Sequence, residues 1–135
     1  MATIVVGYDG TDGSRAALQA AVDLAGELGD SVVAVFAYTV GRRGGEVSDY
    51  AQALHERARE VLEEARSIGG DGLEAVELER SPAEALIDVA DERDARMIVV
   101  ASRGESPLKS ALVGSTPTKL VHLSERPVLV VPCPD

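Results

Sequence analysis

The stretch Thr3-Ile-Val-Val-Gly-Tyr8, together with Ser31-Val-Val-Ala-Val-Phe-Ala-Tyr38, decides the fold class. Both runs are short, apolar and rich in β-branched residues, which is typical of strands buried on both faces of a parallel sheet. Between them, from Ser14 to Leu28, apolar residues recur at intervals of three and four and predict an amphipathic helix that ends at Gly29. A strand, a helix and a second strand in this order predict a right-handed parallel βαβ unit.

The rest of the chain continues the alternation of helices and strands. Helices are predicted over 51–65, from Ser81 onward and over Pro117–Ser124, and strands over Leu73–Leu78, Arg96–Ala101 and Val128–Val131. The helix at Ser81 has the clearest start, because Ser81-Pro-Ala-Glu84 is a capping box with proline at the first helical position. Glutamates interrupt Leu73–Leu78 and predict an edge strand. The sequence therefore predicts an α/β fold, an open five-stranded parallel sheet with helices on both faces.

Length and composition exclude several classes of protein. A chain of 135 residues predicts a single domain, 1–135, and its 45% hydrophobic and 27% charged residues are typical of globular proteins. Its 23 acidic and 13 basic residues give a net charge of -10, which argues against nucleic-acid binding. No apolar run approaches the ~20 residues that cross a bilayer, and the N-terminus lacks a signal-peptide pattern. We therefore expect no membrane contact and a cytoplasmic location.

Two segments at the predicted carboxyl ends of strands carry the candidate chemistry, because ligands of open parallel sheets bind there. The first segment is Gly7–Gly13, and the second runs from Ala101 through Arg103 to Gly104. After the second, Gly114-Ser-Thr-Pro117 enters a helix, where free N–H groups, hydroxyls and a glycine suit a phosphate. Gly104 and Gly114–Thr116 would form two sides of a phosphate cradle, to which Arg103 would add donors. Alternatively, the glycines serve turn geometry and the hydroxyls only cap the helix.

The chain resembles the universal stress protein family along its whole length. The resemblance is carried by Ile4–Gly10, Ser81–Glu84, Met97–Gly104 and Arg126–Pro132. The ATP-binding branch of that family has the pattern glycine, two residues, glycine, nine residues, glycine and then serine or threonine. This chain matches it at Gly104, Gly114 and Ser115 and has Ala101 in place of the first glycine. The alanine methyl group would crowd the ribose or α-phosphate if the backbone must come within contact distance, and alanine would be strained if the position needs a positive φ. If φ is negative there, alanine costs little.

The resemblance implies a Rossmann-like, adenine nucleotide α-hydrolase-like sheet with strand order 3-2-1-4-5. It further implies that Asp9 holds the ribose hydroxyls, that Gly7 flanks the adenosine, and that the Ala37 backbone meets the adenine edge. An acidic side chain after the first strand is also the usual ribose acceptor, while its alternative role is to cap the next helix. The predicted nucleotide-binding residues are Gly7, Asp9, Ala37, Ala101, Ser102, Arg103, Gly104, Gly114, Ser115 and Thr116.

The resemblance also implies a homodimer in which the last strand pairs with its copy in a second chain. The residues predicted for this interface are Val128, Leu129, Val130 and Val131. A short apolar strand at a sheet edge invites association, and symmetric pairing removes that hazard. The alternative is that the helices of the same chain cover this strand.

Two acidic residues near the loops are candidates for holding a metal ion. Glu105 and Asp12 would reach a Mg²⁺ ion bound through the phosphates, because such an ion needs only one or two carboxylates. Alternatively, both are solvated surface acids. We expect no metal ion bound by the protein alone.

Three functions remain open from the sequence. The first is a dimeric regulator of the stress response that binds ATP, or AMP, and acts on an unknown regulatory protein partner. No nucleophile–base pair, metal-ligand cluster or carboxylate pair stands out near the loops, so we expect no catalytic residue and at most slow ATP hydrolysis. The second is a family member that binds no nucleotide and works as a protein-interaction module. The third is an adenylating enzyme, although Asp9–Ser14 lacks the loop typical of that class.

Overall fold

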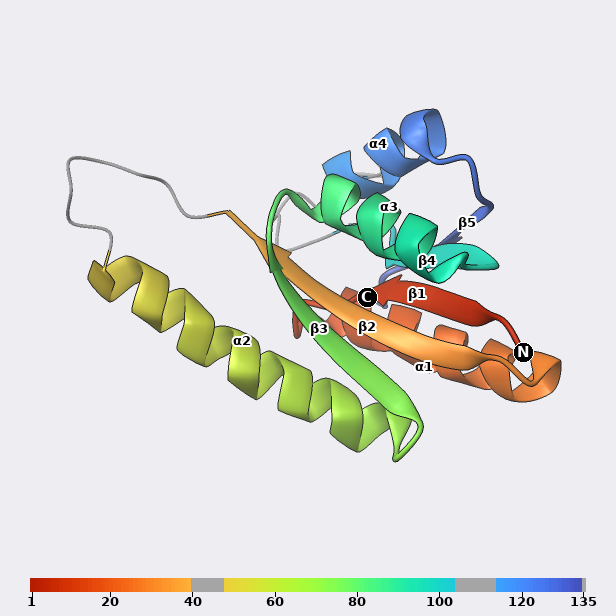
Figure 1. Cartoon of the computed structure of the whole chain (residues 1–135), viewed down its shortest axis with the longest axis horizontal. Coiled ribbons are helices and arrows are strands. Elements are labelled where there is room, and N and C mark those ends of the chain that lie inside the picture. Colours follow the sequence, from red (N-terminus) through yellow and green to blue (C-terminus); the bar gives the residue numbers. More distant parts are fainter. Residues whose placement is uncertain (40–47, 104–113, 135) are drawn as a thin grey trace.

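The computed structural model describes residues 1–39, 48–103 and 114–134 (Figure 1). The elements are β1 (Thr3–Gly7), α1 (Asp12–Leu28), β2 (Ser31–Tyr38), α2 (Ser48–Gly69), β3 (Leu73–Glu79), α3 (Pro82–Arg93), β4 (Met97–Ala101), α4 (Ser115–Leu123) and β5 (Val128–Val131). The strands form one sheet in the order β3-β2-β1-β4-β5, and every neighbouring pair is parallel. The predicted α/β class and strand order are confirmed.

Helices cover both faces of the sheet, as Figure 1 shows with α3 and α4 on one side and α1 and α2 on the other. Successive side chains of a strand point to opposite faces, which explains why all three central residues of β1 are buried. Ile4 and Val6 pack in the cluster with α1 and α2, and Val5 packs in the cluster with α3. A strand with two buried faces has no polar positions, so the uninterrupted apolar run at the start of the chain is the sequence signature of this place in the fold.

The start of α3 at Pro82 agrees with the sequence prediction, whereas α1, α2 and α4 begin two or three residues earlier than predicted. Ser81 is the N-cap of α3, but its side chain makes no capping hydrogen bond, and a Glu84 carboxylate oxygen lies 3.7 Å from Nε of Arg80. The predicted capping box is therefore wrong, although Ser81 is the N-cap and Pro82 opens the helix as predicted. Helix α4 begins at Ser115, two residues before the predicted Pro117, with Gly114 as its N-cap. Proline is tolerated in a first helical turn, where its missing N–H would have no partner.

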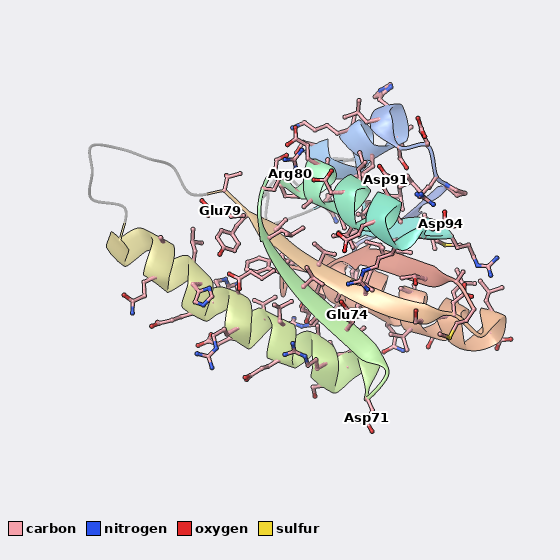
Figure 2. All side chains as sticks on the ribbon, in the orientation of Figure 1. Asp71, Glu74, Glu79, Arg80, Asp91 and Asp94 are labelled. Carbon is pink, nitrogen blue, oxygen red and sulfur yellow. The ribbon has the colours of Figure 1, made fainter. Side chains whose placement is uncertain are left out.

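The two edges of the sheet have opposite character. Strand β3 pairs only with β2, and Glu74 and Glu79 along it are exposed, as Figure 2 shows. The predicted edge strand is confirmed, and its charges disfavour pairing with another strand. Strand β5 lies at the other edge and consists of valine and leucine alone.

No helix within the described residues has the length and apolar character needed to cross a bilayer.

The four residues of β5 are not equally available to a partner. Val128 and Val130 are partly buried and pack against the cluster formed with α3, and Val131 packs against the cluster formed with α1. Leu129 is 40% exposed. The expectation that all four residues serve a dimer interface stays a prediction, and the side chains of Val128, Val130 and Val131 also contact the core of their own chain. Among the described residues no strand pairs with the outer edge of β5, and Leu129 is its most exposed side chain.

Candidate functional site

A cavity of about 290 Å³ opens at the carboxyl ends of β1, β2 and β4. Strand β1 lies between β2 and β4 in the sheet, so the chain leaves β1 toward one side and later returns on the other. This is the switch point at which open α/β sheets bind ligands. The described residues that line the cavity are Gly7, Tyr8, Asp9, Thr11, Ser14, Val35, Phe36, Ala37, Pro82, Leu86, Val100, Ala101, Arg103, Gly114, Ser115, Thr116 and Pro117.

Most of the residues predicted from the sequence meet at this cavity. Those that line it are Gly7, Asp9, Ala37, Ala101, Arg103, Gly114, Ser115 and Thr116. Ser102 is not among the lining residues, while Gly104 and Glu105 lie outside the described residues. Asp12 is exposed, and its carboxylate accepts a hydrogen bond of 2.7 Å from Arg15 Nη1. The cavity thus brings together loops and strand ends that are far apart in the chain.

Ser102 links the site to the C-terminal segment. Its backbone N–H donates to the Val131 carbonyl at 2.8 Å, and its own carbonyl accepts from the Gly114 N–H at 2.7 Å. Its hydroxyl oxygen accepts from the Cys133 N–H at 3.2 Å. The three contacts hold the end of β4 against both the start of α4 and the residues after β5. Ser102 therefore has a place in the framework of the site, which the sequence pattern alone does not reveal.

Asp9 stands in a network of hydrogen bonds at the start of α1. Its Oδ1 accepts from the Thr11 N–H at 3.0 Å and from the Thr11 hydroxyl at 2.6 Å. The N-cap of α1 is Thr11, whose side chain accepts from the Ser14 N–H at 3.2 Å. Asp9 is therefore not the cap of α1, which is its alternative role, and it lines the cavity.

The opposite side of the cavity is formed by the N-terminus of α4. Gly114 is the N-cap, Ser115 and Thr116 occupy the first turn, and that turn contains no acidic residue. The first turn of a helix carries N–H groups without helical partners and a partial positive charge. With Arg103 also lining the cavity, this side is suited to an anion, whereas Asp9 on the other side is suited to hydroxyl donors.

Apolar side chains that the sequence does not mark as site residues form the walls of the cavity. A Cβ atom added to Gly7 would lie 3.3 Å from Leu86 Cδ1 and 3.5 Å from Val100 Cγ1. Gly7 therefore leaves the end of β1 bare of side chain and open to the cavity. Leu86 belongs to the buried stripe predicted for α3, and nothing in that stripe distinguishes a residue beside a cavity from one in the core.

Ala101 has ordinary strand geometry. It pairs in register with Val131, and among the described residues other than glycine only Asp94 has a positive φ. A Cβ atom added to Gly13 in α1 would lie 3.2 Å from Ala101 Cβ, so the alanine methyl group packs toward α1 beside a residue that has no side chain. Ala101 therefore does not have a positive φ, so the alanine at this position causes no backbone strain.

Tyr8 connects the β1–α1 loop to α2. Its side chain is 2% exposed, and its hydroxyl donates to Glu64, which also accepts from Arg15 Nε at 2.7 Å. Burial raises the pKa of Tyr8 above its ordinary value, and hydrogen bonds from Arg15 and Tyr8 lower the pKa of Glu64. The phenol is therefore neutral and Glu64 is charged at neutral pH, so the contact is a charge-assisted hydrogen bond.

Comparisons with known proteins decide the family. The model of the universal stress protein family matches residues 1–132. The chain belongs to this family. A universal stress protein of Thermus aquaticus is 34% identical over 139 residues, which cover 96% of this chain and 97% of the relative. The predicted family membership is confirmed.

Two solved structures of similar universal stress proteins are complexes with a nucleotide. One is a universal stress protein in complex with cAMP, with a TM-score of 0.71, 28% identity and coverage of 98% of both chains. The other is the universal stress protein from Archaeoglobus fulgidus in complex with dAMP, with a TM-score of 0.71 and 28% identity. That match covers 96% of this chain and 97% of the other. Adenine nucleotides are thus ligands of universal stress proteins that resemble this one.

Proposed function

We propose that this universal stress protein binds an adenine nucleotide, ATP or AMP, in the cavity at the ends of β1 and β4, and regulates a stress response through the bound state. The observation that carries the proposal is the opposed chemistry of the two sides of the cavity. A carboxylate, Asp9, lies on one side, a helix N-terminus without an acidic residue in its first turn lies on the other, and Arg103 also lines the cavity. A nucleotide has the complementary halves, a ribose that donates hydrogen bonds and a phosphate that accepts them.

The proposal assigns each part of the nucleotide to residues that line the cavity. The ribose hydroxyls bind Asp9, and the phosphates bind the first turn of α4 from Gly114 and the Arg103 guanidinium. The adenine lies at Ala37 and beside Gly7, where the absence of a side chain permits close approach. Any Mg²⁺ ion would be held through the phosphates with its own waters, because such ions need one or two carboxylates at most.

A regulator is favoured over an enzyme by the residues that line the cavity. Among its described lining residues, the charged side chains are Asp9 and Arg103. One carboxylate and one guanidinium supply binding and orientation, whereas acyl or adenylyl transfer would call for a nucleophile activated by a neighbouring base. The relatives in complex with cAMP and dAMP support an adenine nucleotide as the ligand.

Calorimetric titration with Mg-ATP, after bound nucleotide has been stripped under denaturing conditions, tests this proposal. We expect a dissociation constant of ~100 μM or tighter. Asp9→Ala is expected to weaken binding about thirtyfold, the effect of losing hydrogen bonds to a charged acceptor. The matched control is Asp23→Ala, because Asp23 is exposed on α1, accepts a hydrogen bond from Gln19 and does not line the cavity. If the parent neither releases nor binds nucleotide, the protein is a family member that works as an interaction module.

Restoring the family glycine is not expected to improve binding. The Ala101 methyl group packs toward Gly13 with a backbone free of positive φ, so Ala101→Gly relieves no strain. We expect the affinity for Mg-ATP to stay within about twofold of the parent and stability to fall by about 1 kcal/mol, as the unfolded chain gains freedom. Calorimetry and urea unfolding of the same samples check both values. A tenfold gain in affinity would show that the methyl group obstructs the nucleotide.

We also propose a homodimer formed by β5 against its copy in a second chain. The free edge of β5 is apolar and Leu129 in it is 40% exposed, so the helices of the same chain leave this part of the strand uncovered. Val128 and Val130 contribute less side-chain area to such an interface, because they already pack against the α3 side of the core. The edge at β3 carries the exposed charged side chains of Glu74, which is paired with Arg93, and Glu79, and charged groups are costly to bury in an apolar interface. Of the two edges of the sheet, β5 is therefore the one that gains from pairing.

A further inference from the structure

Asp9 is held by one residue through one of its two carboxylate oxygens. Oδ1 accepts from both the N–H and the hydroxyl of Thr11, at 3.0 and 2.6 Å. Within the described part of the chain, the structure gives no donor to Oδ2. A carboxylate can accept about four hydrogen bonds, so the second oxygen keeps its capacity for a ligand. The two oxygens of Asp9 therefore have different tasks.

Thr11 is itself fixed in place by the first turn of α1. Its carbonyl accepts from the Arg15 N–H at 2.9 Å and from the Ser14 hydroxyl at 3.0 Å. The Ser14 oxygen in turn accepts from the Asp9 N–H at 3.2 Å, and Ser14 is 4% exposed. Gly10, with φ of 84°, makes the turn that brings Asp9 and Thr11 together. The network is closed, so the rotamer of Asp9 follows from the position of Thr11.

The proton of the Thr11 hydroxyl is already committed. A threonine hydroxyl has one proton to donate, and here it points to Asp9 while the oxygen accepts from the Ser14 N–H. Thr11 lines the cavity, yet its hydroxyl has no proton left for a nucleotide. The Thr11 hydroxyl can therefore affect a bound nucleotide only by positioning the Asp9 carboxylate.

We propose that Thr11 is a positioning residue for ribose recognition, which holds Oδ1 of Asp9 so that Oδ2 accepts from the ribose hydroxyls. This inference rests on the proposed nucleotide-binding function and adds to it the residue that sets selectivity for ribose. An oxygen held in place accepts from a hydroxyl without first losing rotamer freedom. The ligands of the two relatives each have one free ribose hydroxyl, because dAMP lacks the 2′-hydroxyl and the 3′-oxygen of cAMP is esterified, and one carboxylate oxygen can accept from one hydroxyl.

The test compares Mg-ATP with the analogue that lacks both ribose hydroxyls, dideoxy-ATP, in Thr11→Val and Thr11→Ser by calorimetry. In the parent we expect ATP to bind at least about tenfold more tightly than dideoxy-ATP. In Thr11→Val we expect the affinity for ATP to fall about fivefold and that for dideoxy-ATP to stay unchanged, because the hydroxyl bond to Asp9 is lost. The same change removes the N-cap bond from the Ser14 N–H, which lowers stability by about 1 kcal/mol and affects both ligands alike. Thr11→Ser keeps that hydroxyl and is expected to discriminate as the parent does. Thr3→Val is the matched control, because Thr3 pairs with Ser31 at the other end of the sheet.

Each other outcome overturns the inference in a recognisable way. If Thr11→Val discriminates between the two ligands as the parent does, Thr11 does not position Asp9. If this variant loses affinity equally for both ligands, Thr11 acts on the nucleotide directly or only supports the fold, and urea unfolding separates these cases. A parent that binds both ligands equally well makes Asp9 irrelevant to ribose. A parent that binds neither overturns the proposed function together with this inference.

Discussion

Leu129→Asp is expected to turn the proposed dimer into monomers. Leu129 is 40% exposed in β5, which is hydrogen-bonded to β4 on one side and has no strand beside it on the other within the described residues. In a symmetric pair of β5 strands, the substitution would place two carboxylates close together in an apolar interface, where burial and like charge both act against association. We expect the dissociation constant of the dimer to rise at least about hundredfold. Sedimentation equilibrium over a range of concentrations at physiological salt measures it.

The chain offers a closely matched control for that experiment. Leu28, the last residue of α1, is 43% exposed and lies outside the β5 edge, so Leu28→Asp introduces the same change elsewhere. This control is expected to keep the dissociation constant of the parent. A parent that sediments as a monomer at every concentration would refute the dimer, and equal weakening by both substitutions would point to net charge as the cause.

Tyr8→Ala is expected to cost the largest loss of stability among the cavity residues, about 3–5 kcal/mol, as for other truncations of large buried aromatic residues. Tyr8 is the largest of the fully buried side chains in the described structure and packs in the cluster formed with α1 and α2. Its truncation leaves a cavity and removes the contact between the β1–α1 loop and α2. Urea-induced unfolding gives the change in free energy, and an unchanged slope with denaturant shows that the transition is still cooperative.

Tyr8→Phe distinguishes the contribution of the aromatic ring to stability from that of the hydroxyl. Phenylalanine fills the same space, and Glu64 keeps its hydrogen bond with Arg15, with its side chain 42% exposed to water. We therefore expect a loss of at most about 1 kcal/mol. If Tyr8→Ala and Tyr8→Phe lower the free energy of unfolding equally, the hydrogen bond to α2 provides the stabilisation, and a role for ring packing is contradicted.

The elements with strong periodicity can be predicted from the sequence, and the details of their ends cannot. Thr3–Gly7 and Ser31–Tyr38 are strands in the structure because an apolar run without polar positions fits the middle of a parallel sheet. The capping box at Ser81 is absent although its residue types are present, because a pattern of residue types does not fix the side-chain rotamers on which the capping hydrogen bonds depend. Pro117 marks the last helix, but its start lies at Ser115.

The candidate site shows the same division. Asp9 and Gly114 can be predicted because they follow strands or open a helix, and the carboxyl ends of parallel strands meet at one edge. Leu86 and Val100 cannot be predicted as cavity walls, because their sequence pattern is that of any core residue. In the sequence, Thr11 is only a polar residue of a glycine-rich loop. The positioning role proposed for it rests on its two hydrogen bonds to Asp9, which only the structure shows.

The sequence by itself determined the class of fold, the parallel sheet, the net negative charge and the family, because each depends on local periodicity, on composition or on motifs that can be read along the chain. The tertiary structure decided the geometry of Ala101, the commitment of one Asp9 oxygen to Thr11, the place of Ser102 beneath the site and the packing of Val130 against the core. These depend on contacts between residues distant in the chain or on the exact turn of a loop. Hydrogen bonds and close packing are set by distances of a few tenths of an ångström, which only the folded arrangement of the elements specifies.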